Sequence, residues 1–121
     1  MAEYNKVILL GNLTRDPDLR YTPQGLAVCE FPLAVTHKSR AHDGGKEEVC
    51  YIDVVVFGRS AEPVKEHLRR GSRVLVDGRL AQRRWETAEG LKKNKHEVVA
   101  ATVQFLDGAA PPSGHEDDLP I

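Results

Sequence analysis

Arginine residues and the only tryptophan alternate with apolar residues between positions 71 and 86. Val74, Val76 and Leu80 share one parity, and the opposite parity, interrupted by Leu75, carries Arg73, Asp77, Arg79, Arg83 and Trp85. A period of two predicts a half-buried strand that presents guanidinium groups and an indole ring to water. Guanidinium matches the geometry of phosphate, and an indole can stack on a base. The same pattern also fits an ordinary charged sheet face with Trp85 covering the core edge, and a bulge at Gly78 would exchange the faces.

Residues 48–57 form a second alternating segment with aromatic side chains. Cys50, Ile52, Val54 and Val56 make an unbroken apolar row, whereas the opposite row reads Tyr51, Asp53, Val55 and Phe57. Two aromatic rings beside a carboxylate are typical of a surface, so this row is expected to face outward.

The sequence contains no set of residues typical of catalysis or metal binding. It has no glycine-rich phosphate loop, no His-Glu-x-x-His and no Cys-x-x-Cys. His37, His42 and Cys50 fit no zinc spacing, and a predicted loop is a poor rigid site for a metal. We therefore expect a protein that is not an enzyme and that uses no cofactor or metal.

Length and composition favour one globular domain followed by a tail. The chain has 121 residues, of which 40% are hydrophobic and 29% are charged. It shows neither a membrane-spanning apolar run nor a signal-peptide pattern, so we expect a cytoplasmic protein that does not enter a membrane. Cys29 and Cys50 are expected to be reduced thiols buried in strands.

The net charge of −1 hides an uneven distribution along the chain. Glu116, Asp117 and Asp118 lie in a tail without Lys or Arg, and residues 1–107 carry 17 basic and 15 acidic side chains. A body charge of +2 does not itself indicate a nucleic-acid partner; the placement of the charges must do so.

The remaining segments supply the elements that position these side chains. Strands are predicted at residues 6–13, 27–37, 48–57, 71–86 and 95–106, with a brief extended piece at 19–21. Pro32 indicates an edge or an irregularity in the second strand. A helix is expected at 61–70, with Ser60 as its N-cap, Gly71 as its stop and Ala61, Val64 and Leu68 on its apolar stripe.

Three strands, one helix and two further strands match the five-stranded Greek-key barrel called the OB-fold. The position of the helix between the third and fourth strands is the discriminating feature. The mainly β barrel is expected to occupy residues 1–107, followed by a flexible linker at 108–115 and an acidic tip at 116–121.

Four groups of residues resemble bacterial single-stranded DNA-binding proteins. They are VILLGNLTRDP (7–17) with RYTP (20–23) and Gly25; DVVVFGR (53–59) with Ala61 and Glu62; GSRV (71–74) with DGRL (77–80) and RRW (83–85); and EVVA (97–100) with VQFL (103–106). Each motif is weak alone, but their joint order and spacing over residues 5–107 are specific. The final Asp-Asp-Leu-Pro is similar to the acidic C-terminal tip of that family.

The resemblance implies an OB-fold subunit of a homotetramer that wraps single-stranded DNA in replication, recombination and repair, without strong sequence preference. By position, it implies that Tyr51, Phe57 and Trp85 stack on bases and that Arg20, Arg59, Arg83 and Arg84 contact the backbone. The implied docking peptide for replication and repair proteins consists of Asp117, Asp118, Leu119, Pro120 and Ile121.

Three features depart from the family pattern. The chain ends in Ile121 where the family usually has Phe, and the linker before the tip is short. Near Ser39, where many members carry an aromatic residue, this chain has His37, Lys38, Ser39 and Arg40, which favours charge over stacking at that point.

Two other functions remain open from the sequence. One is an OB-fold module for structured RNA or sugars, because the fold alone does not decide function. The other is an interaction hub that mainly presents the acidic tip and has weak DNA affinity of its own. A disordered solubilising end is the plainer interpretation of the tip itself.

Overall fold

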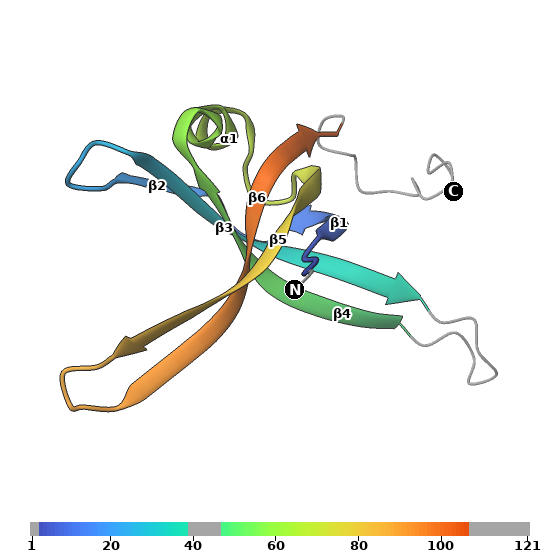
Figure 1. Cartoon of the computed structure of the whole chain (residues 1–121). Helices are drawn as coiled ribbons and strands as arrows, with labels where there is room; N and C mark the ends of the chain where they lie inside the picture. The colour runs from blue at the N-terminus through green and yellow to red at the C-terminus, as the bar shows by residue number, and fades with distance from the viewer. Residues whose placement is uncertain (1–2, 39–46, 107–121) are drawn as a thin grey trace.

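A computed structural model describes residues 3–38 and 47–106 of the chain. The strands are β1 (Val7–Leu13), β2 (Asp18–Tyr21), β3 (Ala27–Lys38), β4 (Glu47–Phe57), β5 (Arg73–Glu86) and β6 (Lys92–Phe105). A 3₁₀ turn, η1 (Gly58–Ser60), leads into the helix α1 (Ala61–His67), which lies between β4 and β5 (Figure 1).

Five of the strands close into a barrel. The order β1-β5-β6-β4-β3 returns to β1 because β1 also pairs with β3 at Asn12 and Leu13. The β4–β6 pair is parallel, and the other pairs are antiparallel. The short β2 extends the sheet beyond β3. This closed barrel with one helix confirms the predicted OB-fold.

The core consists of apolar side chains from every barrel strand and from the helix. Phe31, Leu33, Val54, Val76 and Val98 are at most 1% exposed. Gly11 lies where β1 crosses β3, and a Cβ there would come within 2.4 Å of the carbonyl oxygen of Ala34. The close strand crossing that shuts the barrel therefore requires glycine.

Pro32 lies in an irregular part of the sheet rather than on a free edge. β3 pairs with β2 up to Glu30 and with β1 from Leu33 onward, while Pro32 lies opposite Asp53 on β4. Proline is tolerated here because one neighbour of β3 ends and another begins at this point. Of the two options, the irregularity is confirmed.

The helix is shorter than predicted. It ends at His67 instead of Arg70, because Leu68 adopts an extended conformation while its side chain remains buried in the core. Ser60 makes no capping hydrogen bond through its side chain; it belongs to the 3₁₀ turn that precedes the helix. Leu68 is thus buried as its place on the apolar stripe predicts, but from an extended segment that follows the helix.

The β5–β6 ladder contains a bulge whose extra residue lies on β6. The register shifts between Asp77 and Gly78 because Ala101 has no partner on β5. The faces of β5 are therefore not exchanged at Gly78, and Leu80 pairs with the buried Val98 on the predicted inward side. Leu80 is nevertheless 42% exposed, because β5 continues past the core, so its predicted burial is wrong.

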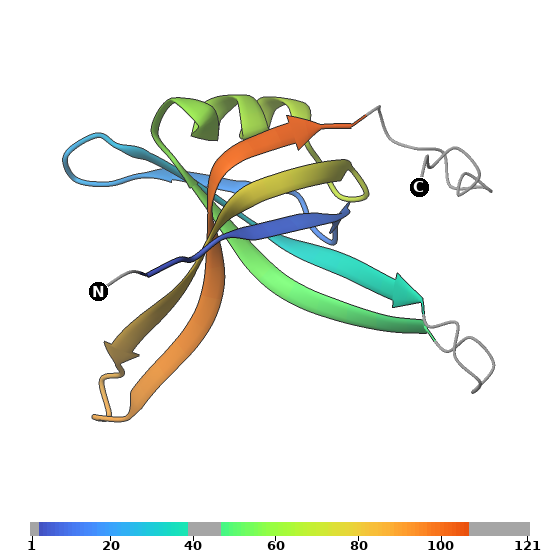
Figure 2. The ribbon, with the colours of Figure 1, turned by 45° about the vertical axis from the view of Figure 1, so that its right-hand side comes forward.

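Two hairpins project from the barrel as long two-stranded ribbons, as Figures 1 and 2 show for β3–β4 and β5–β6. β5 ends at Glu86 and β6 begins at Lys92, so residues 92–94 of the predicted loop at 87–94 belong to β6. Cys50 lies on the β4 ribbon and is exposed, which contradicts its predicted burial, whereas Cys29 is buried. The apolar run Val98, Val99, Ala100, Ala101 and Val103 predicts burial of β6 on both faces, but Ala101 is exposed, so that prediction is wrong.

Candidate nucleic-acid interface

Strand registers place most of the predicted site residues on one continuous face of the sheet. Residues directly paired across strands point to the same side. Arg20 on β2 pairs with Val28 on β3, and Val28 pairs with Phe57 on β4. Further along β4, Val55 pairs with Val99 on β6, and Val99 pairs with Arg79 on β5. We call this set the aromatic face: Asp18, Arg20, Glu30, Tyr51, Asp53, Phe57, Arg79, Arg83, Trp85, Lys93, Lys95 and Glu97.

Three large aromatic side chains on this face are exposed. Tyr51 is 69%, Phe57 46% and Trp85 43% exposed. Tyr51 and Phe57 come from β4, whereas Trp85 lies near the end of β5, on the ribbon that projects from the barrel. Rings left in water on separate strands fit a stacking surface better than a core edge.

A chain of alternating charges crosses the centre of the aromatic face. Nη2 of Arg20 donates to Oε2 of Glu30 at 3.2 Å, and the same Glu30 oxygen lies 3.6 Å from Nη2 of Arg83. Arg83 also donates to Oε1 of Glu97 at 3.3 Å, and Glu97 is only 7% exposed. Asp18 lies 3.9 Å from Arg20, so two arginines meet three carboxylates and the centre of the face has no excess positive charge.

A second ion pair lies on the same face. Lys95 Nζ donates to Oδ2 of Asp53, linking β6 to β4. Residues Lys93 and Arg79 share the face and, among the residues that the structure describes, form no ion pair. Uncompensated positive charge therefore lies along β5 and β6 rather than at the centre.

Arg84 and Arg59 are placed differently from the other predicted residues. Arg84 has the opposite parity to Arg83 and Trp85, and its Nη2 donates to Oε1 of Gln82 at 2.9 Å. Arg59 is exposed in the 3₁₀ turn that directly follows Phe57. The turn starts at Gly58, whose φ of 78° belongs to the left-handed region.

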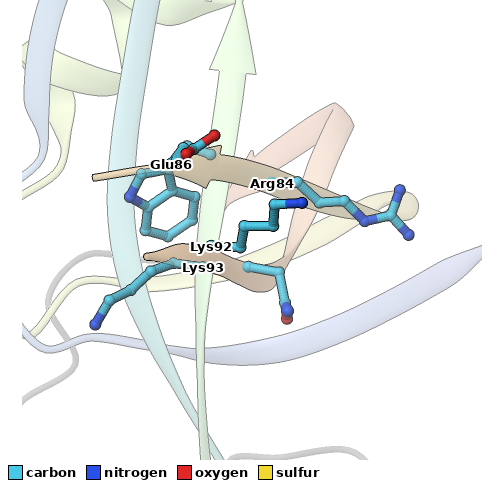
Figure 3. Close-up of a pocket in the computed structure, with 6 residues that line it drawn as sticks. Arg84, Glu86, Lys92 and Lys93 are labelled. Carbon is cyan, nitrogen blue, oxygen red and sulfur yellow. The ribbon is translucent and has the colours of Figure 1, made fainter. Parts of the chain in front are cut away.

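A hollow of about 300 Å³ lies at the end of the β5–β6 ribbon. Figure 3 shows Arg84, Glu86, Lys92 and Lys93 around it, and Trp85 and Asn94 complete its lining. The sequence-based search missed the lysines because it assigned residues 87–94 to a loop. Lys93 and Lys95 alternate with Asn94, and this period of two would have placed Lys93 and Lys95 on the same face as Trp85.

Two titratable groups lie outside the aromatic face and have raised pKa values. Tyr21 donates its hydroxyl to Oε2 of Glu62 at 2.6 Å, joining β2 to α1, and this hydrogen bond raises the pKa of Tyr21. Burial raises the pKa of the Cys29 thiol to about 11. Both groups are therefore held in their neutral forms at pH 7, and neither contributes charge to the interface.

Within residues 3–38 and 47–106, no three His, Cys, Asp or Glu side chains gather in a way that could hold a metal ion. Nor does any helix in these ranges have the length and apolar character needed to cross a membrane.

Comparison with known proteins gives a consistent family assignment. Residues 4–106 match the sequence signature of the Single-strand binding protein family. The chain is 47% identical over 115 residues to the single-stranded DNA-binding protein of Helicobacter hepaticus, covering 94% of this chain and 66% of that protein. Its identity to the protein of the same name from Wolinella succinogenes is 44% over 117 residues, covering 95% of this chain and 72% of the relative.

A solved structure supports the same assignment. The fold matches a deletion mutant of the single-stranded DNA binding protein from Thermus aquaticus with a TM-score of 0.76 and 37% identity, covering 87% of this chain and 51% of that one. The chain thus spans about half of that structure and roughly two thirds of the relatives above. The chain belongs to the single-strand binding protein family.

Proposed function

We propose that this protein binds single-stranded DNA without strong sequence preference, on the aromatic face. The observation that carries the proposal is the shared orientation of three exposed aromatic rings with arginine and lysine side chains across β2, β4, β5 and β6. The names of the relatives support the same ligand.

The physical chemistry of the face suits any base sequence. Every base has a π-face, so stacking on Tyr51, Phe57 and Trp85 would contribute about 1–3 kcal/mol per base regardless of sequence. Backbone contacts from Arg20, Arg59, Arg83 and Arg84 would add affinity that falls as salt rises. A strand whose bases are free to unstack meets both requirements, whereas a duplex hides its base faces.

Competition binding tests this proposal. Fluorescently labelled oligo-thymidine is bound to the protein and displaced by unlabelled oligo-thymidine, duplex DNA, structured RNA or oligosaccharide. We expect efficient displacement only by single-stranded DNA of any sequence. Preferential displacement by structured RNA or by sugar would instead support the other OB-fold functions.

We further propose that the protein assembles, as a homotetramer, through the outer side of β1. Ile8 is 58% and Leu10 is 41% exposed, and Leu10 lies opposite the half-buried Leu75 of β5. These neighbouring apolar side chains form a small patch on a strand outside the aromatic face. Burial of such a patch between subunits would leave the DNA-binding surfaces free to carry one strand around the assembly.

We also propose that the protein is cytoplasmic and nucleoid-associated and acts in DNA replication, recombination and repair. The acidic tip is the feature that supports this role. In this proposal residues 1–107 bind DNA, 108–115 link, and 116–121 dock partner proteins. Asp117 and Asp118 would meet basic rims, while Leu119, Pro120 and Ile121 would enter an apolar pocket. All five lie outside the described residues.

Deletion of residues 114–121 separates this role from the hub alternative. The proposal predicts DNA binding that is equal or tighter, because an anionic tail competes with DNA for the basic face. Capture of replication and repair proteins should be lost in the same variant. Weak DNA affinity in the full-length protein, with partner capture as its main activity, would favour the hub.

A further inference from the structure

Among the residues that the structure describes, no strand lies beside the far end of the β5–β6 hairpin. β6 pairs with β4 only from Glu97 to Val99, so β5 residues 82–86 and β6 residues 92–96 pair only with each other. We call these residues the hairpin arm. A two-stranded ribbon is marginal by itself, so the direction of the arm, and with it the position of Trp85, depends on side-chain contacts at its base.

Two ion pairs connect the arm to the barrel. Arg83 reaches Glu30 on β3, although β6 and β4 lie between β5 and β3 in the sheet order. Lys95 reaches Asp53 on β4. The Arg83 contact to Glu97 stays near the hairpin's own base, since Glu97 lies opposite Ala81. Glu30 therefore makes the longer connection, across the curved sheet.

The same arginine connects Glu30 to the stacking ring. The guanidinium carbon of Arg83 lies 5.9 Å from the centroid of the Trp85 ring, within cation–π distance. Only Nη2 of Arg83 contacts the two carboxylates, at 3.3 and 3.6 Å. The other guanidinium nitrogens have no hydrogen-bond partner among the described residues, so Arg83 can be held by Glu30 and still donate to a phosphate.

We propose that Glu30 is a positioning residue that, through Arg83, fixes the hairpin arm and holds Trp85 toward the aromatic face. This inference rests on the proposed DNA-binding function and extends it to a carboxylate. Glu30 needs no contact with DNA in this role. Its negative charge would by itself repel phosphate, so positioning and simple electrostatics predict opposite effects when the charge is removed.

The chain offers a matched control. Asp18 lies directly opposite Glu30 in the β2–β3 pair, and its carboxylate is 3.9 Å from Arg20, with no contact to Arg83. Asp18→Asn removes one negative charge from nearly the same place without changing a contact of Arg83. Glu30→Gln removes the charge and weakens the contacts of Glu30 with Arg83 and Arg20, while Arg83 keeps its contact with Glu97.

The first experiment uses the free protein, because Trp85 is its only tryptophan. We expect Glu30→Gln to raise the acrylamide quenching constant of Trp85 about twofold, whereas Asp18→Asn leaves it at the wild-type value. Arg83→Gln should raise it at least as much, because this variant also loses the Glu97 contact and the guanidinium beside Trp85. The Glu30→Gln/Arg83→Gln double variant should add nothing to the effect of Arg83→Gln. Equal quenching in wild type and Glu30→Gln would overturn the proposal.

The second experiment measures affinity for oligo-thymidine at fixed salt. We expect Glu30→Gln to bind about fivefold more weakly and Asp18→Asn to bind as well as or better than wild type. Tighter or unchanged binding by Glu30→Gln would overturn the proposal. If the wild-type protein binds no oligo-thymidine, the proposed DNA-binding function is wrong. Acrylamide quenching of Trp85 in wild type and variants would still test the position of the arm.

A third measurement needs no substituted protein. Raising sodium chloride to 1 M shortens the screening length to about 3 Å and weakens the ion pairs at the base of the arm. We expect acrylamide to reach Trp85 more easily in high salt, with unchanged far-ultraviolet circular dichroism. Accessibility that is independent of salt would contradict the proposed role of the ion pairs.

Discussion

Trp85 has an exposed ring beside the guanidinium of Arg83, so its replacement tests base stacking directly. We expect Trp85→Ala to weaken binding of every homopolymer by about 1–3 kcal/mol, because one stacking partner is lost for any base. Fluorescence anisotropy of labelled oligonucleotides measures the loss. Phe105→Ala is the control, since Phe105 is 42% exposed but stacks on His67, at a centroid distance of 5.7 Å, at the other end of β6. Equal losses in both variants would contradict a specific stacking role.

The two cysteines should differ sharply in reactivity. Cys50 is exposed, whereas Cys29 is buried and burial raises its pKa to about 11. We expect one thiol to react with Ellman's reagent in the native protein and both to react after denaturation. Replacement by Cys50→Ser should abolish the native reaction. A fast native reaction that survives this replacement would place Cys29 at the surface.

The raised pKa of Cys29 also fixes the sign of a pH effect. The folded state holds the thiol proton more tightly than the unfolded state, so this contribution to stability is fully present below the usual thiol pKa of 9.0 and disappears between pH 9.0 and about 11. Cys29→Ala should reduce the fall in stability over this alkaline range.

At the scale of single elements, Gly78 allows β5 to approach β6 closely beside the bulge. A Cβ at this position would come within 2.1 Å of the carbonyl oxygen of Val99. We expect Gly78→Ala to lower the free energy of unfolding by more than about 2 kcal/mol, because backbone must move. Gly90→Ala provides the contrast: its φ is 86° but its nearest contact is 3.9 Å away, so a loss of about 1 kcal/mol is expected. Urea denaturation compares the two, and a loss at Gly78 no larger than at Gly90 would contradict a tight crossing.

Strands β4 and β5 show what the alternation of side chains can and cannot predict. Parity correctly grouped Tyr51 with Phe57 and Arg83 with Trp85, because side chains of a strand must alternate. It failed for Leu80 and Cys50, since parity identifies a face but not where the barrel ends and a two-stranded ribbon begins. The helix end was missed because Leu68 is buried as the apolar stripe predicts, but from an extended segment, and the stripe does not distinguish the two conformations.

The ion pairs of the aromatic face could not be predicted from the sequence, for a different reason. Glu30 and Arg83 are 53 positions apart and come from strands that are not neighbours, so no local pattern connects them. Closure of the barrel brings them together. The lack of excess positive charge at the centre of the aromatic face follows from this closure, whereas composition alone indicated only a mildly basic body.

For the whole molecule, the exposed side of β1 makes self-association testable. We expect Ile8→Lys combined with Leu10→Lys to shift the assembly toward smaller species, because charges would replace the apolar patch. Analytical ultracentrifugation measures the masses, and Asn12→Lys on the same strand is the control. Wild-type protein that sediments as a monomer would overturn the proposed tetramer.

Intrinsic fluorescence of Trp85 during titration with oligo-thymidine tests the central claim most directly, because the protein has no other tryptophan. Stacking of bases on Trp85 predicts strong quenching by the single strand and little by duplex DNA, and phosphate contacts predict weaker binding as salt rises. Binding by a second method without quenching would remove Trp85 from the stacking surface. Neither quenching nor binding would contradict single-stranded DNA as the ligand.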